Sequence, residues 1–321
     1  MHLTAFAPGR VNLIGDHTDH TGGLVLPMAI DLGITIEGER GGDRVELVSD
    51  IDPAPAVIPL RGADPATIEP GWARLVAGVV AEVDPEVGFS GSITSTLPVG
   101  AGLASSAAFA VAAALALGAD DDPVNVARLA QRAERRSTGV PCGLMDQPVS
   151  VAGIDGAALL IDTGRAVFRP VPLPPGAEVV VVHSGEQRIL ADSAYAEVRA
   201  RCVSGEPVAA RHVRSENERV EAMSDAFGRE DLEQAGSLMV ESHRSLAELG
   251  VSTPTLDRLV SELLARPGVW GARLTGAGFG GCVVALCAPD AFREPIGDPA
   301  GGAWTRWWRT RPSAGASVSS G

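Results

Sequence analysis

Apolar positions along the chain follow two spacings, which alternate irregularly. Short apolar runs bounded by Gly or Pro predict strands at 44–49, 158–162, 178–183 and 280–287. Apolar residues spaced three and four apart predict helices at 72–83, 103–117, 123–136, 191–202, 216–227, 230–248 and 255–265. Because these elements do not form strict strand–helix–strand units, and no repeat is visible, we expect an α+β fold.

The length of 321 residues suits two closely packed domains. The Pro-rich stretch 168–178 is typical of a junction between domains. We therefore place the domains at 1–168 and 169–321, with the last segment able to return to the first domain. The residues after Pro312 are small and polar, and we expect them to fray at the very end.

The charge of the chain excludes several classes of protein. Its net charge is −14, and all 26 Lys and Arg positions are arginine. So acidic a chain is not expected to bind nucleic acid through a basic surface. The lack of lysine excludes chemistry that depends on an amine, such as a Walker A loop, a protein kinase or a pyridoxal Schiff base. A nucleotide would have to be held by backbone amides, arginine and metal.

The N-terminus has no signal-peptide pattern, and the strongly apolar stretch 103–117 is shorter than the ~20 residues of a membrane-spanning helix. The four cysteines, Cys142, Cys202, Cys282 and Cys287, form neither a CxxC pair nor a disulfide framework. We therefore expect a cytoplasmic protein without a membrane partner, in which 103–117 is a buried helix.

A Gly-rich turn runs directly into this alanine-rich helix. Pro98, Gly100 and Gly102 allow the backbone to approach a phosphate, and the helix start offers unpaired N–H groups. Ser105 and Ser106 lie in the first turn, where their hydroxyls can reach a phosphate or Mg²⁺. The alternative is a core helix with an ordinary N-cap.

A second polar cluster lies in the segment 7–30. Asp16, His17, Asp19 and His20 stand between apolar flanks, as is typical of a pocket wall. Asp and His offer hydrogen-bonding groups for a polyhydroxylated ligand. The alternatives are a metal site formed by these four residues, and a solvated loop.

Two further segments carry candidate chemistry. Asp146 is the single acid in 139–153, among small and apolar residues. A carboxylate there is either paired with an arginine or poised for catalysis, and the alternative is a cap of the next helix. The segment 274–286 combines a Gly-rich turn with a strand, which a plain hairpin turn would also explain.

Together these segments resemble the signatures of the GHMP kinase superfamily, and within it those of the galactokinase family. PVGAGLASSAA (98–108) is similar to the phosphate loop PxGxGLSSSAA, GRVNLIGDHTDHTGG (9–23) to GRxNLIGEHxDYxGG, and GVPCGLMDQ (139–147) to GVPCGIMDQ. LTGAGFGG (274–281) is similar to the third GHMP signature, and weaker likeness covers the whole chain. The resemblance implies a two-domain GHMP kinase fold, with an N-terminal domain like domain 2 of ribosomal protein S5 and a ferredoxin-like C-terminal domain.

The resemblance also implies transfer of the γ-phosphate of ATP to the anomeric hydroxyl of galactose or a related sugar. Asp146 would be the catalytic base, and Arg10 would assist the transfer. The implied sugar-binding residues are Asp16, His17, Asp19, Gly143 and Tyr195. The implied nucleotide-binding residues are Trp72, Pro98, Gly100, Gly102, Leu103, Ser105, Ser106, Gly276 and Gly278, and the implied Mg²⁺ ligands are Ser106 and Glu134. We expect ATP and Mg²⁺ as cofactors, a sugar as the substrate, and a monomer.

Three positions depart from the family pattern. Asp16 replaces Glu and His20 replaces Tyr in the sugar motif, and Ala104 replaces Ser in the phosphate loop. A carboxylate retracted by about one methylene changes which sugar fits, so the identity of the sugar stays open. Two other functions remain as alternatives: a different GHMP kinase, such as a mevalonate or homoserine kinase, and a non-catalytic sugar sensor.

Overall fold

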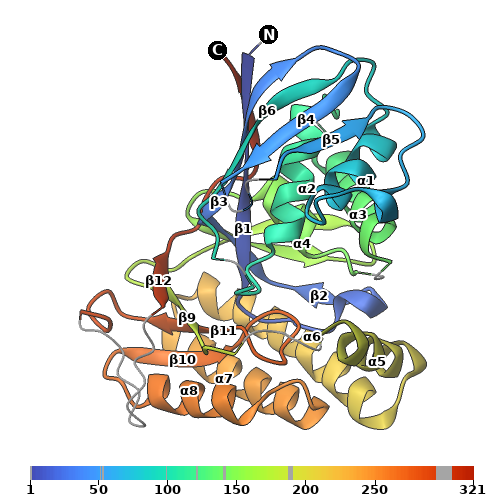
Figure 1. The fold of residues 1–321 in the computed structure, drawn as a ribbon. Coiled ribbons are helices and arrows are strands. Elements are labelled where there is room, and N and C mark those ends of the chain that lie inside the picture. Colours follow the sequence, from blue (N-terminus) through green and yellow to red (C-terminus); the bar gives the residue numbers. More distant parts are fainter. Residues whose placement is uncertain are drawn as a thin grey trace.

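Two large sheets lie at opposite ends of the molecule, each covered by helices (Figure 1). The computed structural model describes residues 2–50, 52, 54–98, 100–120, 122–139, 142–186, 191–293 and 306–321, and of 191–193 the backbone alone. The strands are mostly antiparallel, and among the described strands only β4 and β6 pair in parallel. The expected α+β class is therefore confirmed.

The larger sheet has six strands in the order β13-β1-β3-β6-β4-β5. Its strands are β1 (His2–Asn12), β3 (Pro27–Arg40), β4 (Arg44–Ser49), β5 (Ala56–Pro59), β6 (Phe89–Ser95) and β13 (Ser317–Ser320). Four helices pack beside it: α1 (Ala73–Val83), α2 (Ser105–Ala116), α3 (Pro123–Thr138) and α4 (Asp146–Ala152). The alanines of α2 are buried, because small side chains let this helix pack closely against β1, β3 and α3.

Strand β1 carries an irregularity that matters for the site. Its register with β3 shifts between Pro8 and Arg10. The N–H of Arg10 donates instead to the carbonyl of Leu103 at 3.0 Å. A Cβ at Gly9 would lie 2.6 Å from that carbonyl oxygen, so glycine permits the close approach. The bulge thereby ties β1 to the loop that precedes α2.

The second large sheet has four strands in the order β10-β11-β9-β12. Its strands are β9 (Glu178–His183), β10 (Val269–Leu274), β11 (Cys282–Cys287) and β12 (Trp307–Thr310). Helices α7 (Leu232–Leu249) and α8 (Pro254–Leu264) pack on β10, and α6 (Pro207–Gly228) packs on α7 and α5 (Ala191–Ser204). A small sheet of β2 (Leu24–Val25), β7 (Ala157–Asp162) and β8 (Val167–Pro172), with the short 3-10 helices Asp19–Thr21 and Pro65–Thr67, completes the fold.

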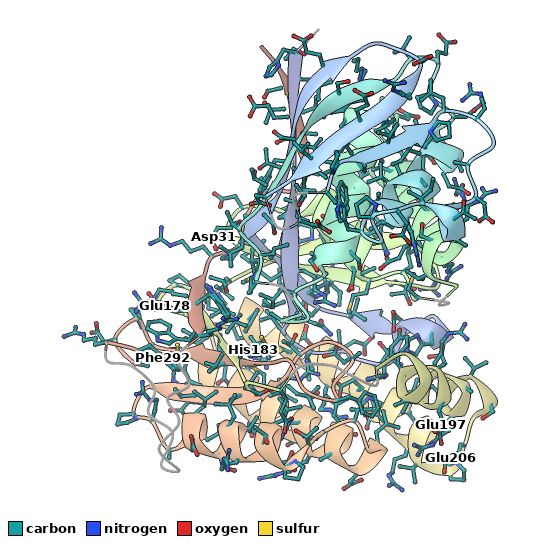
Figure 2. The ribbon with its side chains drawn as sticks, in the orientation of Figure 1. Asp31, Glu178, His183, Glu197, Glu206 and Phe292 are labelled. Carbon is teal, nitrogen blue, oxygen red and sulfur yellow. The ribbon has the colours of Figure 1, made fainter. Side chains whose placement is uncertain are left out.

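After β12 the chain returns to the six-stranded sheet. The N–H of Arg311 donates to the carboxylate of Asp31 at 3.1 Å. Asp31 belongs to β3 and is labelled in Figure 2. Strand β13 then pairs with β1, with Leu3 opposite Ser320, so that both ends of the described chain lie side by side (Figure 1). The expected fraying of the last residues is therefore wrong. A strand of small polar residues forms here because β1 supplies the hydrogen bonds.

The predicted helices and strands lie within two residues of observed elements, with one exception. The helix predicted at 216–227 is wrong at its start, because α6 begins at Pro207. Proline is favoured in the first turn of a helix, and the Glu206 side chain accepts from the N–H groups of Val208 and Ala209. The domain boundary after residue 168 stays a prediction. Within the described residues, no helix is both long and apolar enough to span a membrane.

Candidate active site

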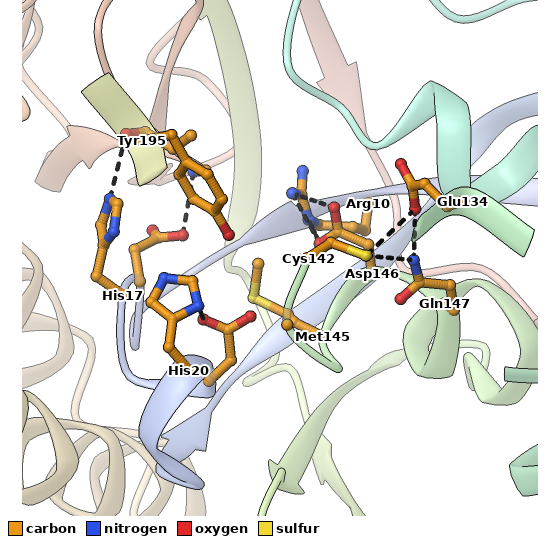
Figure 3. Close-up of a pocket in the computed structure, with 14 residues that line it drawn as sticks. Arg10, His17, His20, Glu134, Cys142, Met145, Asp146, Gln147 and Tyr195 are labelled. Atoms are coloured by element: carbon orange, nitrogen blue, oxygen red, sulfur yellow. Dashed lines mark hydrogen bonds and ion pairs between the residues drawn. The ribbon is translucent and has the colours of Figure 1, made fainter. Parts of the chain in front are cut away.

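Two adjoining cavities lie where β1 ends and α2 begins. The first has a volume of about 240 Å³, and Figure 3 shows its polar lining. It is lined by Arg10, Asp16, His17, Asp19, His20, Glu134, Cys142, Gly143, Met145, Asp146, Gln147, Tyr195, Gly276 and Ala277. The second, of about 440 Å³, is mainly apolar and is bordered by Ser105 and Ser106. The two meet at one hydrogen bond, in which the Ser106 hydroxyl donates to the Glu134 carboxylate.

Arg10 and Asp146 form a bidentate ion pair in the lining of the first cavity (Figure 3). Nε and Nη2 of Arg10 donate to the two carboxylate oxygens of Asp146 at 2.8 and 2.9 Å. Nη1 donates to the carbonyl of Gly102 at 2.7 Å, within the loop before α2. Asp146 keeps 30% of its side chain exposed, so the held carboxylate still faces the cavity. The structure thus brings together two predicted residues that are far apart in sequence.

Asp16 and His17 form one wall of the first cavity. The carboxylate of Asp16 accepts from Nη2 of Arg273 at 2.5 Å and from the N–H of Gly276 at 3.2 Å. The Nε2–H of His17 donates to the carbonyl of Ala277 at 3.2 Å. Both side chains are therefore held by the Gly-rich segment 274–281, and Asp16 is also held by Arg273 of the preceding strand β10.

Asp19 also lines the first cavity, in close contact with the backbone of Gly143. A Cβ at position 143 would lie 1.6 Å from Oδ2 of Asp19, so only glycine admits this carboxylate. Nδ1 of His20 lies 3.3 Å from Oδ1 of Asp19. The ring of Tyr195 packs edge-on against His20, with centroids 5.3 Å apart. The predicted sugar-binding residues therefore line one continuous cavity.

Burial perturbs the titration of these groups. It lowers the pKa of His17 to about 4, helped by the charge of His20, and lowers the pKa of His20 to about 4 as well. Both rings are thus neutral at pH 7, and each can donate and accept a hydrogen bond. Burial, together with the charge of Asp146, raises the pKa of Asp19 to about 6. Burial also raises the pKa of Tyr195.

The start of α2 is open to an anion. Gly100, Gly102 and Ala104 have φ values of 72°, 76° and 60°, which turn the chain sharply into the helix. Ala104, the N-cap residue, makes no side-chain cap, so the first N–H groups of α2 have no side-chain partner from that position. Unpaired N–H groups and the positive end of the helix dipole suit a phosphate.

The second cavity extends away from this helix start. Trp72 and Phe109 form part of its apolar wall, with ring centroids 6.2 Å apart. An aromatic and aliphatic wall beside a helix start that suits a phosphate also suits the flat base of a nucleotide. The predicted residue Trp72 lies here, as do Ser105 and Ser106.

Glu134 lines the first cavity, and both of its carboxylate oxygens accept hydrogen bonds. Its Oε1 accepts from Ser106 at 2.5 Å, and its Oε2 accepts from Nε2 of Gln147 at 2.6 Å. Burial raises its pKa. Within the described residues, no group of three or more His, Cys, Asp or Glu side chains could hold a metal ion. A metal here would therefore need further ligands beyond the protein carboxylates.

Two glycines predicted to bind the nucleotide, Gly276 and Gly278, do not line the second cavity. Gly276 lines the first cavity and donates to Asp16 at 3.2 Å. Gly278 has φ +79°, and a Cβ there would lie 2.2 Å from the carbonyl oxygen of Val251. These positions shape the turn beside Asp16 and its contact with the chain before α8. Pro98 and Leu103 belong to the loop before α2, where the Leu103 carbonyl accepts from Arg10 at 3.0 Å.

Several residues of the site were not predicted from the sequence. Arg273 stands between the mainly apolar run 269–272 and the Gly-rich segment 274–281. A charged residue at such a position was the signal that could have indicated a buried arginine. His212 and Glu216 come from α6, a polar stretch that reads as a surface helix. Gln147 directly follows Asp146 and anchors Glu134.

Comparisons with known proteins agree with this geometry. The galactokinase galactose-binding signature matches residues 2–40, the GHMP kinase N-terminal domain 74–154, and the GHMP kinase C-terminal domain 223–298. The human galactokinase is 39% identical over 91% of this chain and 86% of its own length. The galactokinase of Thermococcus kodakarensis is 40% identical over 88% of this chain and 89% of its own length.

Solved structures show the same fold. Lactococcus lactis galactokinase complexed with galactose superposes with a TM-score of 0.88 and 26% identity, over 98% of this chain and 95% of that one. Mevalonate kinase of Methanococcus jannaschii shares the fold, with a TM-score of 0.79 and 23% identity over 98% of this chain and 99% of that one. The expected two-domain GHMP kinase fold is thus confirmed, and the chain belongs to the galactokinase family of GHMP kinases.

Proposed function

We propose that the protein transfers the γ-phosphate of ATP to the anomeric hydroxyl of galactose. The observation that carries this proposal is the Arg10–Asp146 pair, which stands in the first cavity and also bonds to the loop before α2. Relatives named galactokinase, and the neighbour solved with galactose, support galactose as the sugar.

The first cavity suits a sugar. Asp16, Asp19 and Asp146 supply carboxylate oxygens, and two neutral imidazoles supply groups that both donate and accept. Such a lining matches the many hydroxyls of a hexose, each of which donates one hydrogen bond and accepts others. The edge-on ring of Tyr195 offers an apolar surface to the C–H face of the sugar ring.

The chemistry follows from the position of Asp146. Its carboxylate takes the proton of the anomeric hydroxyl as that oxygen attacks the γ-phosphorus. A bond forms between the sugar oxygen and phosphorus, the bond to the bridging oxygen of ADP breaks, and ADP leaves. A guanidinium has five N–H donors; three are used on Asp146 and Gly102, so two remain unused by these partners. Arg10 thus orients the base and offsets the negative charge of the transfer.

Mg²⁺ fits the junction of the two cavities. Ser106 and Glu134 place a hydroxyl and a carboxylate together there, and Mg²⁺ prefers oxygen ligands, usually one or two carboxylates with substrate phosphates. The bound ion would neutralise charge on the β- and γ-phosphates. Because the chain has no lysine, the remaining positive potential would come from arginine side chains, Arg10 among them, and from the start of α2.

The test is a coupled ADP-release assay with the purified protein, ATP, Mg²⁺ and a panel of sugars. The panel holds galactose, glucose, galactosamine, N-acetylgalactosamine and arabinose, with mevalonate and homoserine as non-sugar acceptors. We expect the highest kcat/KM with galactose and a sugar 1-phosphate as product. Turnover of a non-sugar acceptor alone would point to another GHMP kinase, and sugar binding without turnover would point to a sensor.

A further inference from the structure

A buried charged cluster lies directly beneath the first cavity. Arg273, in β10, is fully buried and is among the largest fully buried side chains of the described residues. Its Nη2 donates to the carboxylate of Asp16 at 2.5 Å, and its Nη1 donates to the carbonyl of Asn12 at 3.3 Å. Both partners belong to the segment that forms the wall of the sugar cavity. Arg273 of the second large sheet therefore hydrogen-bonds to the segment 12–16 at two points.

The charges of the cluster balance. Asp16 is 2% exposed and Glu216 is fully buried, and their two negative charges face the positive charges of Arg273 and Arg219. Burial by itself would raise the pKa of Glu216, but the charges of Arg273, His212 and Arg219 and the hydrogen bond from Ser242 outweigh it and lower this pKa overall. Buried charges are costly unless they are paired and hydrogen-bonded. Each carboxylate of the cluster is therefore paired with an arginine, Asp16 with Arg273 and Glu216 with Arg219.

Helix α6 holds the same segment from another side. The N–H of Gly15 donates to the carboxylate of Glu216 at 2.9 Å. The Nε2–H of His212 donates to the backbone carbonyl of Asp16 at 3.0 Å. His212 and Glu216 are four residues apart, so they lie on one face of α6. Asp16 is thus fixed through its backbone as well as through its carboxylate.

The carboxylate of Asp16 has spare capacity after these bonds. An ionised carboxylate offers about four lone-pair sites, and Arg273 and Gly276 occupy two of them. Asp16 also lines the first cavity. The same group can therefore accept from a sugar hydroxyl while it is held from behind, which pre-orients it before the sugar arrives.

We propose that Arg273 is a positioning residue for sugar binding: it fixes the carboxylate of Asp16, and with it the cavity wall, in the orientation that accepts the sugar. The proposal rests on the proposed sugar-kinase function. It also gives a physical reason for Asp at position 16. With Arg273 already 2.5 Å from the carboxylate, a side chain longer by one methylene has to displace either the arginine or the sugar.

The test compares two matched arginine variants. Arg273→Lys keeps the buried charge but replaces the planar fork by a single ammonium, which cannot span the Asp16 carboxylate and the Asn12 carbonyl in the same way. Arg309→Lys is the control. Arg309 lies in the same sheet, bonds to the carboxylate of Glu178 and the carbonyl of Pro289, and lines neither of the two cavities.

We expect Arg273→Lys to raise KM for the sugar at least about tenfold, because a misplacement of about 1 Å can cost on the order of 10²-fold, and to leave KM for ATP within about twofold. Sugar titration by calorimetry without ATP should show the same loss. Arg309→Lys should change neither KM by more than about twofold. Thermal melting of both variants checks that they are folded at the assay temperature.

The outcomes separate the two proposals. If the wild type is active and Arg273→Lys has an unchanged KM for the sugar, or raises both KM values by the same factor, Arg273 has no positioning role. A wild type that turns over none of the sugars overturns the proposed function, and the positioning role with it. Arg273→Met, which leaves Asp16 unpaired, is expected to be less stable than Arg273→Lys and to lose sugar affinity further.

Discussion

Replacement of Asp146 by Asn tests the proposed base directly. Both carboxylate oxygens of Asp146 accept from Arg10, at 2.8 and 2.9 Å. Asn keeps the shape of the side chain but has one acceptor oxygen, and its NH₂ group would face a donor of Arg10. The variant therefore loses the proton acceptor and one of the two charge-assisted hydrogen bonds.

The two losses differ in size and in what they affect. Loss of a general base typically lowers the rate about 10²–10⁴-fold, which corresponds to about 2.7–5.4 kcal/mol in the barrier. Loss of a hydrogen bond to a charged group costs about 1.5–3 kcal/mol, and this loosens Arg10 and the loop that it holds. Because both act on the transfer step, we expect kcat to fall at least about 10³-fold, while the sugar Kd rises about tenfold at most.

The measurements are kcat by coupled ADP release at saturating ATP and sugar, and the sugar Kd by calorimetry. Asp162→Asn is the matched control, because Asp162 also pairs with an arginine, Arg165, but lines neither cavity. The control should keep kcat within about twofold. An Asp146→Asn variant that retains more than about a third of the wild-type kcat would refute the base assignment, and a Kd that weakens as much as kcat/KM falls would make Asp146 a binding residue only.

Three further predictions follow from the cavity geometry. Burial raises the pKa of Asp19 to about 6, and the ionised form is the better acceptor for a sugar hydroxyl. The value of kcat/KM for the sugar should therefore fall as the pH drops through about 6. Asp19→Asn should abolish this fall at low pH, and a fall that persists in the variant would assign it to another group. Gly143→Ala places a Cβ 1.6 Å from the Asp19 carboxylate and should raise KM for the sugar at least about tenfold. Gly228→Ala, with open space around its Cβ, should leave this KM unchanged. Equal KM values in the two variants would show that the contact between Gly143 and Asp19 does not matter for sugar binding. Glu134→Gln and Ser106→Ala should raise the Mg²⁺ concentration needed for half-maximal rate, and full turnover of the wild type in excess chelator would rule out the proposed metal role.

The local parts of the site could be predicted from the sequence. The loop before α2 combines glycines, a helix start and two serines within a few consecutive residues, so its chemistry is visible without the fold. The sugar motif is likewise continuous along the chain, and its resemblance to a known family supplied the roles of Arg10 and Asp146. The contact between these two residues, which are 136 positions apart, is a product of the fold and could only be inferred through that resemblance.

The supporting residues could not be predicted, for physical reasons that differ between elements. Glu216 and His212 belong to a helix rich in charged residues, and such a pattern is typical of a solvated surface; they are buried because each has a partner in the sugar segment. Strand β13 consists of small polar residues with little intrinsic preference for a sheet, and it forms because β1 offers a free edge. In both cases tertiary partners, rather than local pattern, decide the outcome.

Under the proposed roles, the three hydrogen bonds of Arg10 connect the binding of the two ligands. Its guanidinium joins the carbonyl of Gly102, in the loop before α2, to the carboxylate of Asp146, in the first cavity. A nucleotide that tightens the loop also restrains the carboxylate, and a sugar that orients the carboxylate restrains the loop. Linkage requires the two effects to be equal. Whatever factor ATP imposes on the affinity for the sugar, the sugar must impose on the affinity for ATP.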